Sequence, residues 1–149
     1  MKQEFPKLKI TTENCFYGMH PELVMKTTYA FIQEKDKWHV KITVFRYDEK
    51  ATSKRITIDK SIYDEFISSL SKIRINIPID FEIGCDGGFK QIEFGDYSGG
   101  IKLRWWSVAP KGWERINSIT CDLILKINEI ENSQNKSLRI EAKSVQPLL

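Results

Sequence analysis

The side chains with the greatest chemical potential in this 149-residue chain are its three cysteines and two histidines. Cys15 and His20 are five residues apart, but no second pair of ligands follows at the short spacing that structural zinc sites use. A cysteine nucleophile also needs a base held beside it, and His39 falls in a segment with the pattern of a strand. We therefore expect no metal site and no Cys–His catalytic pair.

Carboxylates offer a second kind of chemistry, because Asp80 and Glu82 lie two residues apart on one face of an expected strand, close to Asp86. Acidic residues are common on the solvent face of a strand, and nothing in the sequence indicates shifted pKa values. The glycine pairs at 87–88 and 99–100 match no phosphate-binding loop, since neither leads directly into a helix. We expect no catalytic residues and no cofactor, and a carboxylate enzyme is kept as an alternative.

The most informative segment is Ile101–Ser107, whose alternation places Lys102, Arg104 and Trp106 on one face and Trp105 on the other. An exposed tryptophan with an arginine and a tyrosine nearby is typical of a protein-binding hot spot, so these three residues, with Tyr97, are the candidate partner-binding residues. Basic residues interleaved with an aromatic side chain are also typical of single-stranded nucleic-acid platforms. The simplest alternative is that Trp106 packs under a loop and the two cations are ordinary surface charges.

Runs of β-branched and aromatic residues predict the strands that would position this segment. The clearest is residues 38–47, where Trp38, Val40, Ile42 and Val44 alternate with polar residues, as in a half-buried antiparallel strand. A short strand at 5–10 is expected at a sheet edge or to begin near Pro6. The other expected strands are residues 27–33, 54–58, 79–83, 89–94, 101–107 and a short edge strand at 137–141.

Two segments have the apolar spacing of helices. The first begins near Asp59 or Ser61, either of which can cap it, and ends before Pro78. The second opens at Pro110, which suits a first helical turn, and is expected to end at residues 132–136, leaving a tail from about 142 to 149. The apolar stripes are Ile62, Phe66, Leu70 and Ile73 in the first helix, and Trp113, Ile116, Ile119, Leu123, Ile127 and Ile130 in the second.

The order of these elements predicts an α+β domain over residues 1–149. Strands and helices are segregated rather than alternating, so we expect an antiparallel sheet of five to seven strands with both helices packed on one face. The chain is 41% hydrophobic and 29% charged with a net charge of +3, values that fit an ordinary globular domain. A positive charge this small does not by itself indicate nucleic acid as the partner.

The expected cellular location follows from the ends of the chain and from its cysteines. Cys15, Cys85 and Cys121 are odd in number and widely spaced, which argues against a disulfide framework and favours a reducing compartment. The N-terminus lacks the apolar segment of a signal peptide, and no apolar run approaches the roughly 20 residues that span a bilayer. We therefore expect a soluble cytoplasmic protein without a membrane partner.

The run Cys85-Asp86-Gly87-Gly88, followed by Trp105-Trp106 and then by Pro110 and Trp113 at the start of an apolar helix, resembles small uncharacterised bacterial proteins of the polymorphic-toxin immunity type. The resemblance covers about a third of the chain. It implies a cytoplasmic protein that binds and blocks a toxin without a cofactor. Inhibitors of nuclease toxins are usually acidic, and the slightly basic charge of this chain departs from that pattern.

The sequence thus favours a non-enzymatic protein-binding domain, with an immunity-type inhibitor of a toxin as its specific form. The alternative is a weak single-stranded nucleic-acid-binding module that uses Lys102, Arg104 and Trp106. The identity of the protein partner and the oligomeric state are not indicated by any pattern in the sequence.

Overall fold

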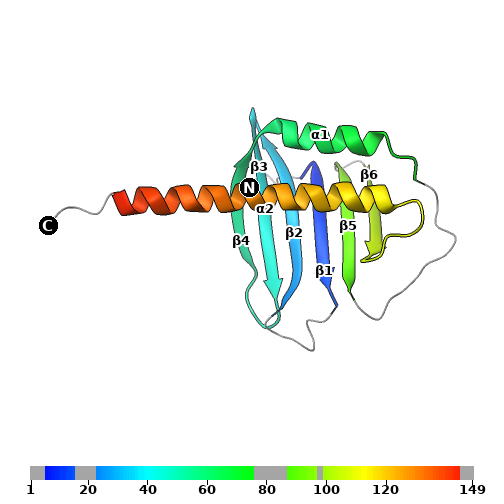
Figure 1. The fold of residues 1–149 in the computed structure, drawn as a ribbon, viewed down its shortest axis with the longest axis horizontal. Helices are drawn as coiled ribbons and strands as arrows, with labels where there is room; N and C mark the ends of the chain where they lie inside the picture. Colours follow the sequence, from blue (N-terminus) through cyan, green and yellow to red (C-terminus); the bar gives the residue numbers. More distant parts are fainter. Residues whose placement is uncertain (1–5, 16–22, 76–86, 97–98, 145–149) are drawn as a thin grey trace.

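Six strands and two helices make up the fold in the computed structural model, which describes residues 6–15, 23–75, 87–96 and 99–144. The six strands form one antiparallel sheet in the order β4-β3-β2-β1-β5-β6 (Figure 1). The expected α+β class, the number of strands and the two helices are confirmed. In chain order the elements are β1 (Leu8–Asn14), β2 (Val24–Glu34), β3 (Lys37–Arg46), β4 (Thr52–Ile58), α1 (Lys60–Ser71), β5 (Gly88–Asp96), β6 (Gly99–Trp106) and α2 (Glu114–Ser144).

Strand β1 lies in the interior of the sheet, paired antiparallel with β2 on one side and with β5 on the other. The expectation of an edge strand here is wrong, and the alternative, that Pro6 stands near the strand start, is right. Pro6 precedes the ladder, where its missing N–H interrupts no pairing. The first ladder contact is made by the Lys7 N–H, which donates to the Phe31 carbonyl oxygen at 2.8 Å.

Strand β5 pairs with β1 along one edge and with β6 along the other. Turn-forming glycines signal a change of direction, but they do not specify which strand lies alongside afterwards. The backbone N–H and C=O groups of a central strand need hydrogen-bond partners along both edges. Strand β5 provides these partners along the edge of β1 that faces away from β2. Residues 79–83 lie outside the described residues.

The core lies on one face of the sheet, which we call the covered face. The register aligns Leu8 with Phe31 in β2, and Phe31 with Val40 in β3, and all three side chains are fully buried. Ile92 from β5 continues the same layer. Trp38, Val40 and Ile42 are buried together, as their alternation predicts.

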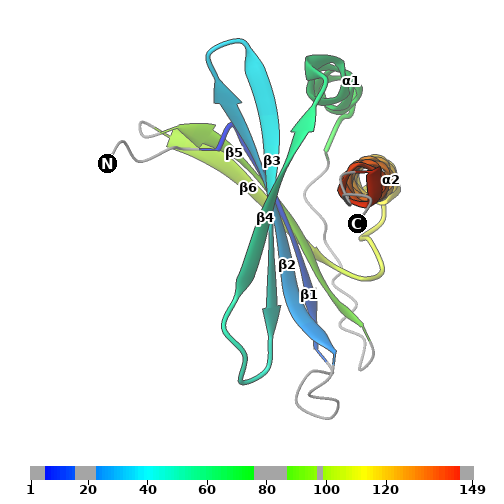
Figure 2. The same cartoon turned by 90° about the vertical axis from the view of Figure 1, so that its left-hand side faces the viewer.

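Both helices pack on this covered face, and α2 runs across the strands rather than along them (Figures 1 and 2). Helix α1 is capped by Asp59, whose carboxylate accepts the Ser61 backbone N–H at 2.8 Å. The expected alternative cap at Ser61 is therefore not used. Ile62 and Phe66 of α1 meet the buried stripe of α2, which confirms both apolar patterns.

Helix α2 is longer than its sequence suggests, with 31 residues from Glu114 to Ser144. The expected helix end at 132–136 and the short edge strand at 137–141 are both wrong, because these residues belong to α2. The tail expected from about 142 stays a prediction, since residues 145–149 lie outside the described residues. No glycine or proline interrupts α2. Its serines are compatible with a helix because they bond back into it, Ser133 to the Glu129 carbonyl at 3.0 Å and Ser137 to the Ser133 carbonyl at 3.2 Å.

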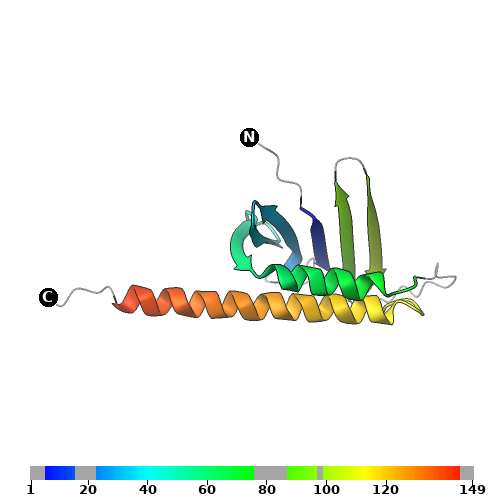
Figure 3. The same cartoon turned by 90° about the horizontal axis from the view of Figure 1, so that it is seen from above.

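The C-terminal part of α2 extends past β4 and away from the sheet (Figures 1 and 3). Near this edge Gln134 donates to the Thr57 carbonyl at 2.8 Å, and Glu131 forms an ion pair with Lys54. These contacts cover part of the β4 edge. No helix among the described residues is long and apolar enough to cross a membrane.

Shortening α2 tests which part of the helix stabilises the domain. A chain ending at Lys136 keeps the two contacts with β4, so its free energy of unfolding should stay within about 1 kcal/mol of the full chain's. Ile127→Ala removes apolar atoms from a side chain that is 1% exposed, and should cost about 2–5 kcal/mol. Chemical denaturation measures both. A shortened chain as unstable as the Ile127 variant would show that residues 137–149 help to hold the core.

Candidate functional site

Both helices lie on one side of the sheet, and we call the opposite side the open face (Figure 2). Trp105 is 3% exposed on the covered face, so its neighbours in β6 point the other way. Lys102, Arg104 and Trp106 therefore share the open face, as the alternation predicts, while their role in binding stays a prediction. Tyr97, the fourth candidate, lies outside the described residues.

A line of aromatic and charged side chains crosses the open face at one end, and we call it the aromatic row. The register places its members opposite one another on five neighbouring strands. Lys26 lies over the Phe45 ring, 5.0 Å from its centroid, and the rings of Phe89 and Trp106 meet edge to face at 4.6 Å. From β3 to β6 the aromatic row is Phe45, Lys26, Glu13, Phe89 and Trp106.

Arg104 is held against this row by two contacts. Its guanidinium lies 4.2 Å from the centroid of the Phe89 ring and donates to the Glu13 carboxylate at 2.9 Å. The Arg104 side chain is still 46% exposed, so it combines a fixed position with access to solvent. The sequence alone does not indicate Glu13, which is 91 residues from Arg104.

The sequence does hold a signal for Phe89. Counting equal numbers of residues outward from Gly95 and Gly100 places Phe89 opposite Trp106, and these two residues are paired in the sheet.

Trp106 is half-buried rather than exposed, and its indole N–H is buried without a hydrogen-bond partner. A Cβ atom on Gly87 would stand 3.6 Å from that nitrogen and 2.3 Å from the Ser107 hydroxyl. The same hydroxyl accepts the Gly88 N–H at 2.7 Å and donates to the Gly88 carbonyl at 3.0 Å. The backbone at the start of β5 is thus fixed close beside the Trp106 ring.

Lys102 belongs to a second cluster on the open face, centred on Glu93. The Glu93 carboxylate pairs with Lys9 at 3.0 Å and with Lys102 at 2.9 Å, and it accepts a hydrogen bond from Gln91 at 2.8 Å. Partial burial acts to raise the pKa of Glu93, but hydrogen bonds and positive charge from Lys102 and Lys9 together outweigh it and lower that pKa. Glu93 is therefore charged at neutral pH and joins β1 to β6.

The positive charge of the chain is concentrated on the open face. By strand alternation this face carries seven basic side chains against three carboxylates, an excess of four, whereas the whole chain has a net charge of +3. The basic residues are Lys9, Lys26, Lys37, Lys41, Arg55, Lys102 and Arg104, and the carboxylates are Glu13, Glu34 and Glu93.

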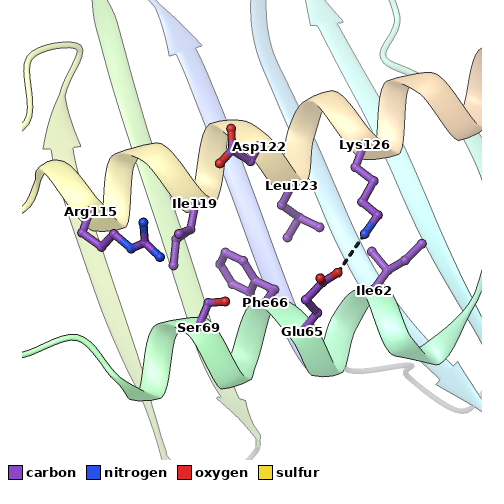
Figure 4. Close-up of a pocket in the computed structure, with 9 residues that line it drawn as sticks. All are labelled: Ile62, Glu65, Phe66, Ser69, Arg115, Ile119, Asp122, Leu123 and Lys126. Carbon is purple, nitrogen blue, oxygen red and sulfur yellow. Dashed lines mark hydrogen bonds and ion pairs between the residues drawn. The ribbon is translucent and has the colours of Figure 1, made fainter.

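On the covered side, a groove of about 280 Å³ lies between α1 and α2 (Figure 4). Phe66, Ile119 and Leu123 line its apolar part, and Lys126 bridges it by donating to Glu65 at 2.8 Å. That hydrogen bond and the charge of Lys126 lower the pKa of Glu65. The groove is therefore the packing boundary between the two helices, and the Lys126–Glu65 ion pair bridges it.

The remaining chemical candidates are not brought together in the described part of the chain. Residues 6–15, 23–75, 87–96 and 99–144 hold no group of three or more His, Cys, Asp or Glu that could bind a metal. Cys15 and Cys121 are free thiols. Asp80, Glu82 and Asp86 lie outside the described residues, so the carboxylate alternative remains a prediction from sequence.

The unpartnered indole of Trp106 gives a direct test of its role. Trp106→Phe keeps an aromatic ring beside Phe89 but removes a buried N–H that lacks an acceptor, so the free energy of unfolding should be unchanged or higher by about 1 kcal/mol. Trp106→Ala also removes the ring contact and should lower it by about 1–3 kcal/mol. Urea denaturation of both variants decides. Equal losses for Phe and Ala would show that the N–H has a partner.

Glu93 predicts a pH dependence with a defined sign. Its folded-state pKa is lowered from the ordinary 4.5, so its stabilising effect is present above that value and is lost as pH falls through the folded-state pKa. At pH 7, Glu93→Gln should cost about 1 kcal/mol, a modest loss because the partner lysines are partly exposed. Denaturation at pH values from 7 down to 3 should show the two proteins converging. A difference that is constant with pH would mean that the charge of Glu93 contributes nothing.

Comparison with known proteins identifies no relative of this chain. No protein-family model, no curated protein and no solved structure matches the chain at a significant level. The candidate site is accordingly defined by the aromatic row, Arg104 and the Glu93 cluster alone, and no residue role is transferred from another protein.

Proposed function

We propose that this chain is a non-enzymatic domain that binds another protein through its open face. The specific form that the resemblance implies is an immunity-type inhibitor that occupies a toxin in the cytoplasm. In this proposal the domain acts by surface complementarity, without a cofactor and without a membrane. Arg104 and Trp106 are its central contact residues, with Lys102 beside them and Tyr97 as the fourth residue expected from the sequence.

The observation that carries the proposal is the aromatic row with Arg104 stacked on it. Tryptophan and arginine are enriched among the residues that dominate protein interfaces. Here Arg104 is held by Glu13 and by the Phe89 ring, so little conformational freedom remains for a partner to remove. A contact group that is fixed before binding loses less entropy on binding than a mobile one.

The size of the open face supports the same proposal. Six strands spaced by about 4.8 Å, each at least seven residues long, give it an area of roughly 600 Å². One partner in a standard-size protein interface buries roughly 800 Å². The open face therefore provides about three quarters of that area, and a partner that also contacts its rim would complete a standard-size interface.

The alternative, a weak single-stranded nucleic-acid-binding module, is favoured by the excess of positive charge on the open face. Two features weigh against it. Bases bind such modules by stacking on aromatic rings, but the rings of Phe45 and Phe89 already have cations over them. Lys102 and Arg104 are also engaged with Glu93 and Glu13, so a phosphate would have to compete with carboxylates.

A pull-down with matched variants tests the proposal. The tagged chain is incubated with lysate of the source organism, with and without nuclease, and retained proteins are identified by mass spectrometry. We expect a protein that is retained after nuclease treatment by the wild type and by Arg115→Ala, a control in which an exposed arginine on the helix side is removed. Arg104→Ala should reduce its retention about tenfold or more, as for an interface hot spot.

The contrary outcomes are distinct from one another. If Arg104→Ala and Arg115→Ala lose retention equally, the open face is not the binding surface. The same conclusion follows if neither variant loses retention. Loss of all retained material on nuclease treatment would favour the nucleic-acid alternative, whose affinity should also fall steeply as salt rises.

A further inference from the structure

The chemistry of the partner is indicated by a second line of side chains on the open face, which we call the basic row. The register aligns its members on six neighbouring strands, and on the five strands that also carry the aromatic row the two rows are four positions apart. Four of its six members are cations and one is a carboxylate. From β4 to β6 the basic row is Arg55, Lys41, Ala30, Lys9, Glu93 and Lys102.

The basic row has more positive charge than its own carboxylates balance. Lys9 and Lys102 share the single carboxylate of Glu93. Lys41 is exposed, and no ion pair is found for it in the described part of the chain. A partner that brings carboxylates to this row would therefore meet unbalanced charge, and opposite charges across an interface favour both encounter and correct orientation.

The two rows are separated by shorter side chains. Between them the register places Ser53, Thr43, Thr28 and Thr11 on consecutive strands, followed by Gln91 and Arg104. Thr11 is 5% exposed even though neither α1 nor α2 lies on this face. The open face thus has an aromatic border, a band of mostly short side chains and a basic border.

The dimensions of this surface fit an α-helix. Two rows four residues apart along a strand are separated by about 14 Å, and six strands span about 24 Å. A helix is about 10–12 Å in diameter and rises 1.5 Å per residue, so about 16 residues would cross the whole sheet. The covered face already accepts a helix in this direction, since α2 crosses the same strands (Figure 1).

We propose that the open face binds an amphipathic acidic helix of the partner protein, laid across the strands with its carboxylates on the basic row and its apolar side on the aromatic row. This inference rests on the proposed function, and it specifies the chemistry of the segment that is bound. Lys41, Lys9 and Lys102 select its acidic side, and the ring edges of Phe89 and Trp106 contact its apolar side.

Synthetic peptides of about 16 residues provide the test. One has glutamates on one side of the helix and leucines on the other, a second has lysine in place of each glutamate, and a third is a scrambled sequence of the first. Binding to the full chain is followed by NMR shifts of backbone amides. We expect only the acidic amphipathic peptide to bind, with shifts in β1, β2, β3, β5 and β6 and not in α1 or α2.

Charge-reversal variants connect the binding to the basic row. Lys41→Glu and Lys102→Glu should each weaken binding of the acidic peptide about fivefold to tenfold. Lys60→Glu, on the exposed side of α1, should leave the affinity unchanged. Thermal unfolding of each variant confirms that the fold is intact before affinities are compared.

Three results would overturn the inference. These are equal binding of the acidic and scrambled peptides, shifts confined to α1 and α2, and tighter binding of a 16-nucleotide oligothymidylate than of the acidic peptide to the open face. The proposed function fails separately. If the acidic peptide does not bind but Arg104→Ala still releases the protein captured from lysate, only the partner's chemistry has been misidentified.

Discussion

The double pairing of β1 is the constraint on which the rest of the structure depends. This strand joins the β2–β3–β4 meander to the β5–β6 hairpin, and its buried Leu8 and Ile10 side chains form the middle of the core. Its outward side matters equally, because Glu13 lies opposite Lys26 on one side and Phe89 on the other. A slip of one residue in β1 would move these side chains to opposite faces, so the same register specifies both the core and the aromatic row.

Because both helices pack on one side of the sheet, the two faces differ in the side chains they carry. The covered face takes the apolar side chains, and α2 contributes a long stripe to it that includes Ile116 and Ile127. Neither α1 nor α2 packs on the open face, so it can keep a charge excess that a core could not contain. Its Ile32 side chain is nevertheless buried, with 6% of its surface exposed.

Local patterns in the sequence were sufficient for the elements whose side chains repeat regularly, and for the face on which Lys102, Arg104 and Trp106 lie. They were insufficient where the structure depends on distant pairing. Nothing in the sequence near β1 indicates that its second neighbour is β5. That pairing is determined by the assembly of the whole sheet, not by the local alternation of apolar and polar residues. The length of α2 was also not predictable from local patterns, because the polar residues near 132–136 resemble a helix end. In the structure the hydroxyls of Ser133 and Ser137 instead donate to helix carbonyls four residues earlier. Glu13 could not be predicted as a partner of Arg104 either, because their contact depends on the pairing of strands that are distant in the sequence.

The ion pairs on the open face set a condition on any partner. Exposed pairs such as Arg104–Glu13 contribute little to stability, about 0–1 kcal/mol each, so their main effect is to hold the cations in place. A partner that covered them and broke them would leave buried charges uncompensated, which costs far more than the pairs contribute. Favourable binding must therefore keep Glu13 and Glu93 in their pairs and add carboxylates where cations exceed them. This requirement excludes a neutral apolar surface and favours a partner whose acidic side chains reach Lys41 and Lys102.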